Sequence, residues 1–246
     1  MSGLTWLGHS TVVIDLDGTR VVTDPILRWR IWHLRRDTAV AAGALGALDA
    51  VLVSHTHDDH LDLRSLERLD RNVPVVVPRG VGGLVRRRGF AHVVELDVGG
   101  ELELGAVCIR ATHAEHESSR GPFSPGAPSL GFILDGTSRI YFAGDTALFS
   151  GMRELRPVDV ALLPVAGWGP RLGPGHLDPA SAVEALRLLE PKTALPIHWG
   201  TLRRLFAQRP DDRPARDFER LAGERAPGVD VRVLSIGETL ALEGVR

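Results

Sequence analysis

Three histidines and two aspartates occur within residues 55–60, directly after the apolar run at residues 50–53. Imidazole nitrogens and carboxylate oxygens bind zinc at about 2.0 to 2.2 Å without a thiolate or a redox change. Burying this many imidazoles and acids without a cation would cost too much free energy. The motif therefore indicates a metal site rather than a solvated polar turn. Its members are His55, His57, Asp58, Asp59 and His60.

The residues on either side of the motif predict how it is held. Residues 50–53 predict a buried strand, and residues 62–69 predict a helix with Asp62 as its N-cap. Side chains two apart in an extended segment point the same way, so His55 and His57 can share one ion. Asp59 and His60 follow the turn toward the helix and are offset toward a second ion.

Three other predicted strands end at side chains that bind metals. Alone, such a histidine or aspartate usually caps or hydrogen-bonds the backbone, but together with the motif they indicate ligands. These strands are residues 139–143, followed by Asp145, residues 193–197, followed by His198, and residues 106–112, followed by His113 and His116.

The order of these groups resembles the metallo-beta-lactamase superfamily of metal-dependent hydrolases. The pattern is His-x-His-x-Asp-His, a later histidine, Gly-Asp and a final histidine. Residues 5–11, 23–25, 175–179 and 197–201 resemble the branch that contains N-acyl-phosphatidylethanolamine phospholipase D and the ascorbate-phosphate lactonase-like proteins. The resemblance spans about residues 4–202. It implies an α/β (α+β) fold, the four-layer αββα sandwich, without defining a substrate.

The resemblance also implies two divalent metal ions. The implied ligands are His55, His57 and His116 for one ion, Asp59, His60 and His198 for the other, and Asp145 as the bridge. His116 suits the pattern better than His113, because Arg120 follows it and relatives often carry proline at the position of His113. Zinc is favoured, although manganese, iron or nickel accept the same ligands. Asp24 is expected to hydrogen-bond a ligand histidine, with a plain turn aspartate as the alternative.

Such a ligand set implies hydrolysis. Two ions about 3.5 to 4 Å apart share a water, lower its pKa and hold the hydroxide as a nucleophile. Asp59 and Asp145 take part in catalysis as ligands, and Asp58 orients water or hydrogen-bonds the loop. His176 is expected to contact the oxyanion or protonate the leaving group; helix capping is the alternative.

Two loops are expected to determine the substrate. Residues 164–176 are rich in glycine and proline and would carry Trp168 and Arg171 over the metals. Residues 25–36 are basic and aromatic. Four alternatives are open for this segment. It could be a lid that covers an anionic or lipid-like substrate, a membrane-surface contact, or a dimer contact. In the fourth, its aromatic side chains pack on the edge of the sandwich and its arginines are solvated.

The predicted substrate is a small ester-like molecule, with a phosphodiester favoured. The branch resemblance is strongest at residues 176–179 and 198–201, and arginines cluster near the expected mouth. A lactone or carboxylic ester, hydrolysed at the same site, is the alternative. A non-catalytic metal-binding or regulatory protein on this fold is an alternative of another class, and the occupation of every expected ligand position argues against it.

Composition agrees with an enzyme of this kind. The chain has 246 residues, 43% hydrophobic and 24% charged, which predicts a single domain over residues 1–246. A net charge of −2 gives no general attraction to nucleic acid, so a nuclease is disfavoured. No run of eighteen apolar residues and no signal peptide are evident, so no transmembrane segment and a cytoplasmic location are expected.

The remaining periodicity predicts two sheets with helices outside them. The clearest helix, at residues 179–190, has Asp178 as its cap and Pro179 at its first position. Further strands are expected near residues 4–7, 11–15, 19–23, 74–77, 92–95, 130–135, 159–163 and 231–242, and further helices near residues 80–88 and 214–223.

Overall fold

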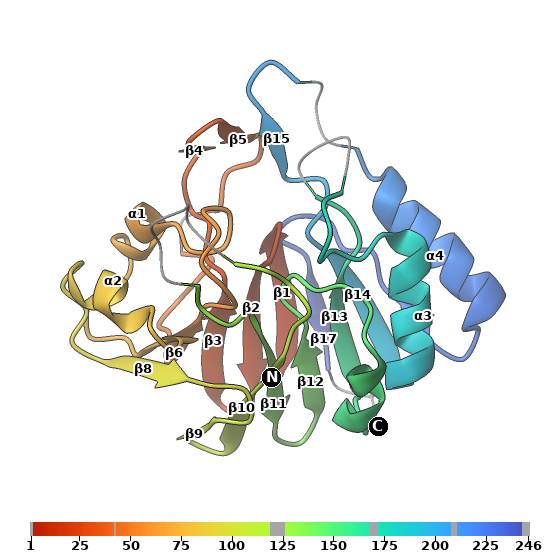
Figure 1. Ribbon diagram of the computed structural model, residues 1–246, viewed down its shortest axis with the longest axis horizontal. Coiled ribbons are helices and arrows are strands. Elements are labelled where there is room, and N and C mark those ends of the chain that lie inside the picture. Colours follow the sequence, from red (N-terminus) through yellow and green to blue (C-terminus); the bar gives the residue numbers. More distant parts are fainter. Residues whose placement is uncertain (1, 42, 119–125, 168–171, 208–210, 243–246) are drawn as a thin grey trace.

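The computed structural model describes residues 2–41, 43–118, 126–167, 172–207 and 211–242. Two seven-stranded sheets lie face to face, and helices cover their outer faces (Figure 1). These are the layers of the αββα sandwich, so the predicted α/β (α+β) fold is confirmed.

The first sheet is antiparallel at one edge and parallel at the other. Within this sheet, adjacent strands from β17 to β3 pair antiparallel, and adjacent strands from β3 to β8 pair parallel. The strands, in spatial order, are β17 (Thr239–Ala241), β1 (Gly3–Gly8), β2 (Thr11–Leu16), β3 (Thr19–Thr23), β6 (Ala50–Leu52), β7 (Val75–Pro78) and β8 (Val93–Leu96).

The second sheet has the same mixed character. Its neighbours from β9 to β12 are antiparallel, and those from β12 through β13 and β14 to β16 are parallel. The strands, in spatial order, are β16 (Asp230–Val231), β14 (Thr193–Ile197), β13 (Val160–Pro164), β12 (Arg139–Phe142), β11 (Leu130–Asp135), β10 (Val107–His113) and β9 (Glu101–Leu104).

Alternation within single strands explains why both faces of the first sheet are covered. In β2, Val12 and Ile14 belong to the core between the sheets, whereas Val13 packs with Val22 and Val51 in a second core. Successive side chains of a strand point to opposite faces. A sheet that is apolar on both faces needs a packed layer on each, and the helices supply the outer one.

The helices lie in two groups. Figure 1 shows α1 and α2 on one side of the molecule and α3 and α4 on the other. As predicted, Asp178 caps α3, and its carboxylate accepts a hydrogen bond from the Ser181 amide at 2.7 Å. None of the described helices is long and apolar enough to cross a bilayer. The helices are α1 (Leu63–Leu66), α2 (Gly82–Arg86), the 3-10 helix η1 (Ser150–Leu155), α3 (Pro179–Leu189) and α4 (Arg213–Arg225).

A small third sheet stands apart from the sandwich and has no counterpart among the predicted strands. It contains β4 (Arg30–Ile31), β5 (Leu34–Arg36) and β15 (Leu202–Arg204), and it projects at one end of the molecule (Figure 1). The segment at residues 25–36 is therefore largely a hairpin joined to the distant β15. Its own small core comprises Ile26, Ile31, Leu34 and Leu202.

The prediction of a single strand at residues 231–242 was wrong. The chain instead forms β16 in the second sheet and β17 in the first, so its C-terminal part closes an edge of each sheet. The residues between the two strands cross from one sheet to the other. Apolar residues along this crossing, such as Leu234 and Ile236, pack on the main core, which explains why the sequence resembles one continuous strand.

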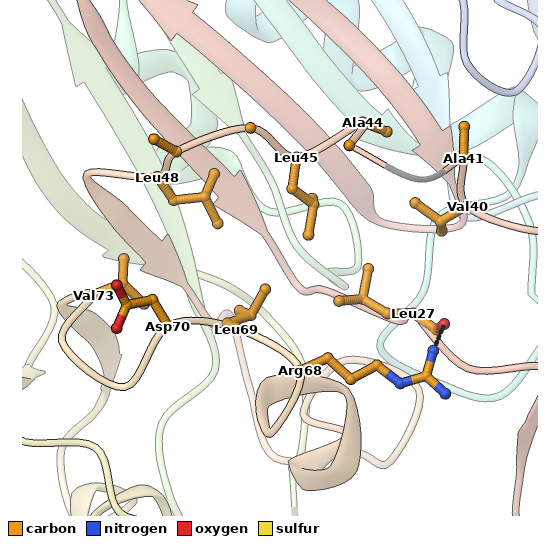
Figure 2. A pocket seen from close by; sticks show the side chains of 13 residues that line it. Leu27, Val40, Ala41, Ala44, Leu45, Leu48, Arg68, Leu69, Asp70 and Val73 are labelled. Carbon is orange, nitrogen blue, oxygen red and sulfur yellow. Dashed lines mark hydrogen bonds between the residues drawn. The ribbon is translucent and has the colours of Figure 1, made fainter.

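An apolar pocket of about 450 Å³ lies between residues 40–48 and the chain that follows α1 (Figure 2). Figure 2 shows Leu45, Leu48 and Leu69 around it, with Arg68 at its edge. The Arg68 guanidinium donates to the Leu27 carbonyl at 2.7 Å, so this cation is engaged with the backbone. The lining carries no histidine among the described residues, so this pocket is distinct from the histidine-rich region at residues 55–60.

Candidate metal centre

The predicted ligands converge because they follow strands of both sheets. The motif at residues 55–60 follows β6 of the first sheet, and Asp145 and His198 follow β12 and β14 of the second. The carboxyl ends of parallel strands in one sheet meet at one edge, which is where ligands bind in such sheets. A Cβ at Gly144 would lie 2.8 Å from Ser54 Cβ and 2.9 Å from the Leu130 carbonyl, so only glycine fits before Asp145.

One group of donors consists of His55, His57 and His116. His57 Nδ1 lies 3.0 Å from His55 Nε2 and 3.1 Å from His116 Nε2, so three nitrogens converge on one position. His55 is fully buried and the other two are partly buried. Three imidazoles at this spacing could hold one metal ion.

A second group of donors surrounds Asp59. Its Oδ2 atom lies 3.7 Å from His60 Nε2 and 3.6 Å from His198 Nε2. It also lies 3.0 Å from Nε2 of His9, which follows β1. All four side chains are buried, and they could hold a second ion.

Asp145 lies between the two groups. Its Oδ2 atom is 3.2 Å from Nε2 of both His60 and His198, and 4.0 Å from His55 Nε2. The side chain is 2% exposed. This carboxylate therefore contacts donors of both groups, which is the position that a bridging ligand requires.

Partners behind the imidazoles orient them. His60 Nδ1 lies 2.7 Å from Asp24 Oδ2, and the same carboxylate accepts from the Ser54 hydroxyl at 2.6 Å, so the predicted Asp24–histidine hydrogen bond is confirmed. His198 Nδ1 donates to the Ala166 carbonyl at 2.7 Å, and His116 Nδ1 donates to the Gly175 carbonyl at 2.8 Å. Each bond fixes the orientation of its ring and directs Nε2 toward the centre, where it could bind a metal ion once deprotonated.

The charges of the centre fit a cation. Burial alone would raise the pKa values of Asp59 and Asp145, but the surrounding imidazoles hold both pKa values well below their usual range. Burial opposes protonation of His60, yet the nearby carboxylates, led by Asp145, raise its pKa well above the usual value. His60 Nε2, His198 Nε2 and Asp145 Oδ1 are buried without a hydrogen-bond partner among the described residues. Bound divalent ions would satisfy these atoms and replace the proton.

His9 belongs to this centre and was not predicted as a site residue. Burial, followed by the neighbouring His198, lowers the pKa of His9 to about 3, so its ring is neutral. Its backbone is tied down, since its amide donates to Thr201 Oγ1 at 2.7 Å and its carbonyl accepts from the His198 amide at 3.0 Å. The available signal was a histidine directly after a strand, the position that His198 also has.

His176 also reaches the centre. Its Nε2 atom lies 3.4 Å from Asp145 Oδ2, and its ring lies 4.7 Å from the His116 ring. Asp178, rather than His176, caps α3. His176 and Asp58 line a cavity of about 280 Å³ beside the candidate ligands. The predicted rim residues Trp168 and Arg171 lie outside the described residues.

The structure places His116, and not the nearby His113, among the candidate metal ligands. His113 is half-exposed, its Nε2 atom lies 3.1 Å from Glu115 Oε2, and it belongs to none of the described groups of donors that could hold a metal ion. Replacing His116 by alanine should therefore reduce bound metal, whereas His113→Ala, the matched control, should leave it unchanged. Elemental analysis of both purified variants measures this, and equal losses from the two would contradict the assignment of His116.

The fold and the centre together define a metal-dependent hydrolase of the metallo-beta-lactamase type. The sequence profile of the beta-lactamase superfamily domain matches residues 19–199, and the chain belongs to this superfamily. The resemblance in the sequence is thus confirmed at the level of superfamily and hydrolase class.

Curated relatives and a solved structure resemble the chain. A UPF0173 metal-dependent hydrolase of Deinococcus radiodurans is 35% identical over 242 residues, 96% of this chain and 97% of that protein. The N-acyl-phosphatidylethanolamine-hydrolyzing phospholipase D 1 of Caenorhabditis elegans is 32% identical over 235 residues, 81% of this chain and 65% of that protein. The solved structure of Igni18, a metallo hydrolase of Ignicoccus hospitalis, matches with a TM-score of 0.75 and 27% identity, covering 97% of both chains.

Proposed function

We propose that this hydrolase cleaves a phosphodiester, using two divalent ions, with zinc as the first candidate. The observation that carries the proposal is the convergence of nine imidazole and carboxylate side chains on one centre, in which three buried atoms have no hydrogen-bond partner among the described residues. The proposed ligands are His55, His57 and His116 for one ion, Asp59, His60 and His198 for the other, and Asp145 as the bridge.

When bound there, two divalent ions activate a water and polarise the ester that is attacked. The chain's own residues supply the positioning. Asp24 holds the His60 ring through Nδ1, and the carbonyls of Ala166 and Gly175 hold the His198 and His116 rings in the same way. We assign His176, on the cavity wall, to contact the oxyanion or to deliver a proton to the leaving group.

The phosphodiester is supported by the relative from Caenorhabditis elegans, whose name describes a phospholipase D. A lactone or carboxylic ester is the second candidate, and a specific observation favours it. Among the described residues, no arginine or lysine lines the cavity beside the ligands. Arg28 donates to the Arg30 carbonyl and lies 3.4 Å from Asp62, and Arg30 donates to the Trp32 carbonyl. These arginines are therefore engaged elsewhere rather than aimed at a phosphate.

A substrate panel tests the proposal. Zinc-loaded protein is assayed against bis(4-nitrophenyl) phosphate, simple lactones, carboxylic esters and thioesters, with the chelated protein as control. We expect metal-dependent turnover of the phosphodiester. Turnover restricted to lactones or carboxylic esters would replace the first candidate by the second. Inactivity toward every class, with two equivalents of metal bound, would favour a binding or regulatory role.

A further inference from the structure

The cavity beside the candidate ligands is lined by two chemically different sets of residues. Its volume is about 280 Å³. One set consists of metal-binding and acidic side chains, and the other is the tip of the β4–β5 hairpin. The first set is His57, Asp58, Asp59, Asp145 and His176, and the second is Ile31, Trp32, His33 and Leu34.

Trp32 is the apolar side chain of the hairpin that remains available at this cavity. Ile31 and Leu34 are 2% and 4% exposed, because they form the small core beneath the third sheet. Trp32 is 75% exposed. Leaving a large ring in water forfeits the free energy that its burial would contribute.

The backbone that carries Trp32 is held firmly although the ring is not packed. Its φ of +50° lies in the left-handed region, which bulky residues rarely adopt. The Trp32 carbonyl accepts from Arg30 Nε at 3.0 Å, and the His33 carbonyl accepts from the Leu205 amide at 2.8 Å. Unfavourable backbone conformations of this kind persist where surrounding contacts enforce them, and they occur often at ligand sites.

We propose that Trp32 determines substrate specificity by binding an apolar, planar group next to the bond that is hydrolysed. The inference rests on the proposed function, since the candidate metal ligands would hold the reacting end of the substrate. The reacting group then faces the polar set of residues, and the ring of the substituent stacks on the indole. The cavity, of about 280 Å³, has room for one such ring beside the reacting group.

Binding of two inert phosphonates tests this inference without turnover. Zinc-loaded protein is titrated calorimetrically with phenylphosphonate and methylphosphonate, whose acidic groups are the same. We expect tighter binding of the phenyl compound, and we expect Trp32→Ala to reduce that preference by about 3- to 10-fold, the scale of one aromatic contact. Trp32→Phe should restore most of the preference.

Trp29→Ala is the matched control, since Trp29 is also exposed, at 55%, directly before β4, but does not line the cavity. An unchanged preference in Trp32→Ala, or an equal loss in Trp29→Ala, would overturn the inference. Metal content measured on each variant distinguishes a lost contact from a disrupted centre. A protein that prefers phenylphosphonate but hydrolyses no ester would overturn the proposed function, and only the binding of a planar group by Trp32 would remain supported.

Discussion

Replacing Asp145 by alanine should abolish hydrolysis and reduce bound metal. The Asp145 carboxylate lies 3.2 Å from His60 and His198 and 4.0 Å from His55, so it lies between the two groups of donors. Its loss leaves several buried imidazoles facing one another without a negative charge between them. We expect kcat/KM to fall by at least about 10²- to 10³-fold, the scale for losing a preorganised charged group.

Metal content and kinetics, measured on the same preparation, check this expectation. Asp135→Ala is a suitable control. Asp135 is the last residue of the neighbouring strand β11, at the end of the sheet away from Asp145, and it is exposed in an ion pair with Arg139. That variant should retain both metal and activity. Two equivalents of metal in Asp145→Ala would contradict the role of this residue as a bridge.

Arg36→Met should destabilise the fold by about 3 kcal/mol or more, because each buried polar group left without a partner costs about 1–3 kcal/mol. Arg36 is 1% exposed and has no acidic partner among the described residues. Its guanidinium donates to the carbonyls of Leu7, Ile26 and Thr38. Burial lowers its pKa to about 10, so it remains charged at neutral pH. Methionine fills the space but satisfies none of these carbonyls.

Urea unfolding at fixed zinc concentration measures this loss. Arg35→Met makes the same chemical change one residue away, where the side chain is 54% exposed and pairs with Asp37 at the surface. Exposed ion pairs contribute about 1 kcal/mol or less, so this variant should lose little stability. Similar losses in the two variants would show that the buried guanidinium has no special role.

The positions of the candidate ligands were predictable because each follows an apolar strand. Asp145 and His198 come directly after segments that read as buried strands, and such strands end together at one edge of a parallel sheet. The interaction of Asp24 with His60 was predictable for a related reason, since Asp24 follows β3, which pairs with β6 just before the motif. Local pattern and strand order were sufficient for these residues.

The third sheet was not predictable from local pattern. Its strands have two or three residues each, which is too short for alternation to show. It also joins the hairpin to β15, more than 160 residues later in the chain, where Leu202 pairs with Arg36. His9 was missed for a similar reason, because a single histidine at a strand end usually makes an ordinary hydrogen bond. Only the folded chain brings it to Asp59.

The donors of the centre come from both sheets, with His55, His57, Asp59 and His60 following β6 and Asp145 and His198 following β12 and β14. Ions bound there would cross-link the N-terminal and C-terminal halves of the chain through metal coordination. Metal affinity and resistance to unfolding would then be thermodynamically linked, and free metal at about 100 times its Kd would add roughly 2.7 kcal/mol. Removing the metal would therefore weaken the contact between the two halves of the chain as well as abolish hydrolysis.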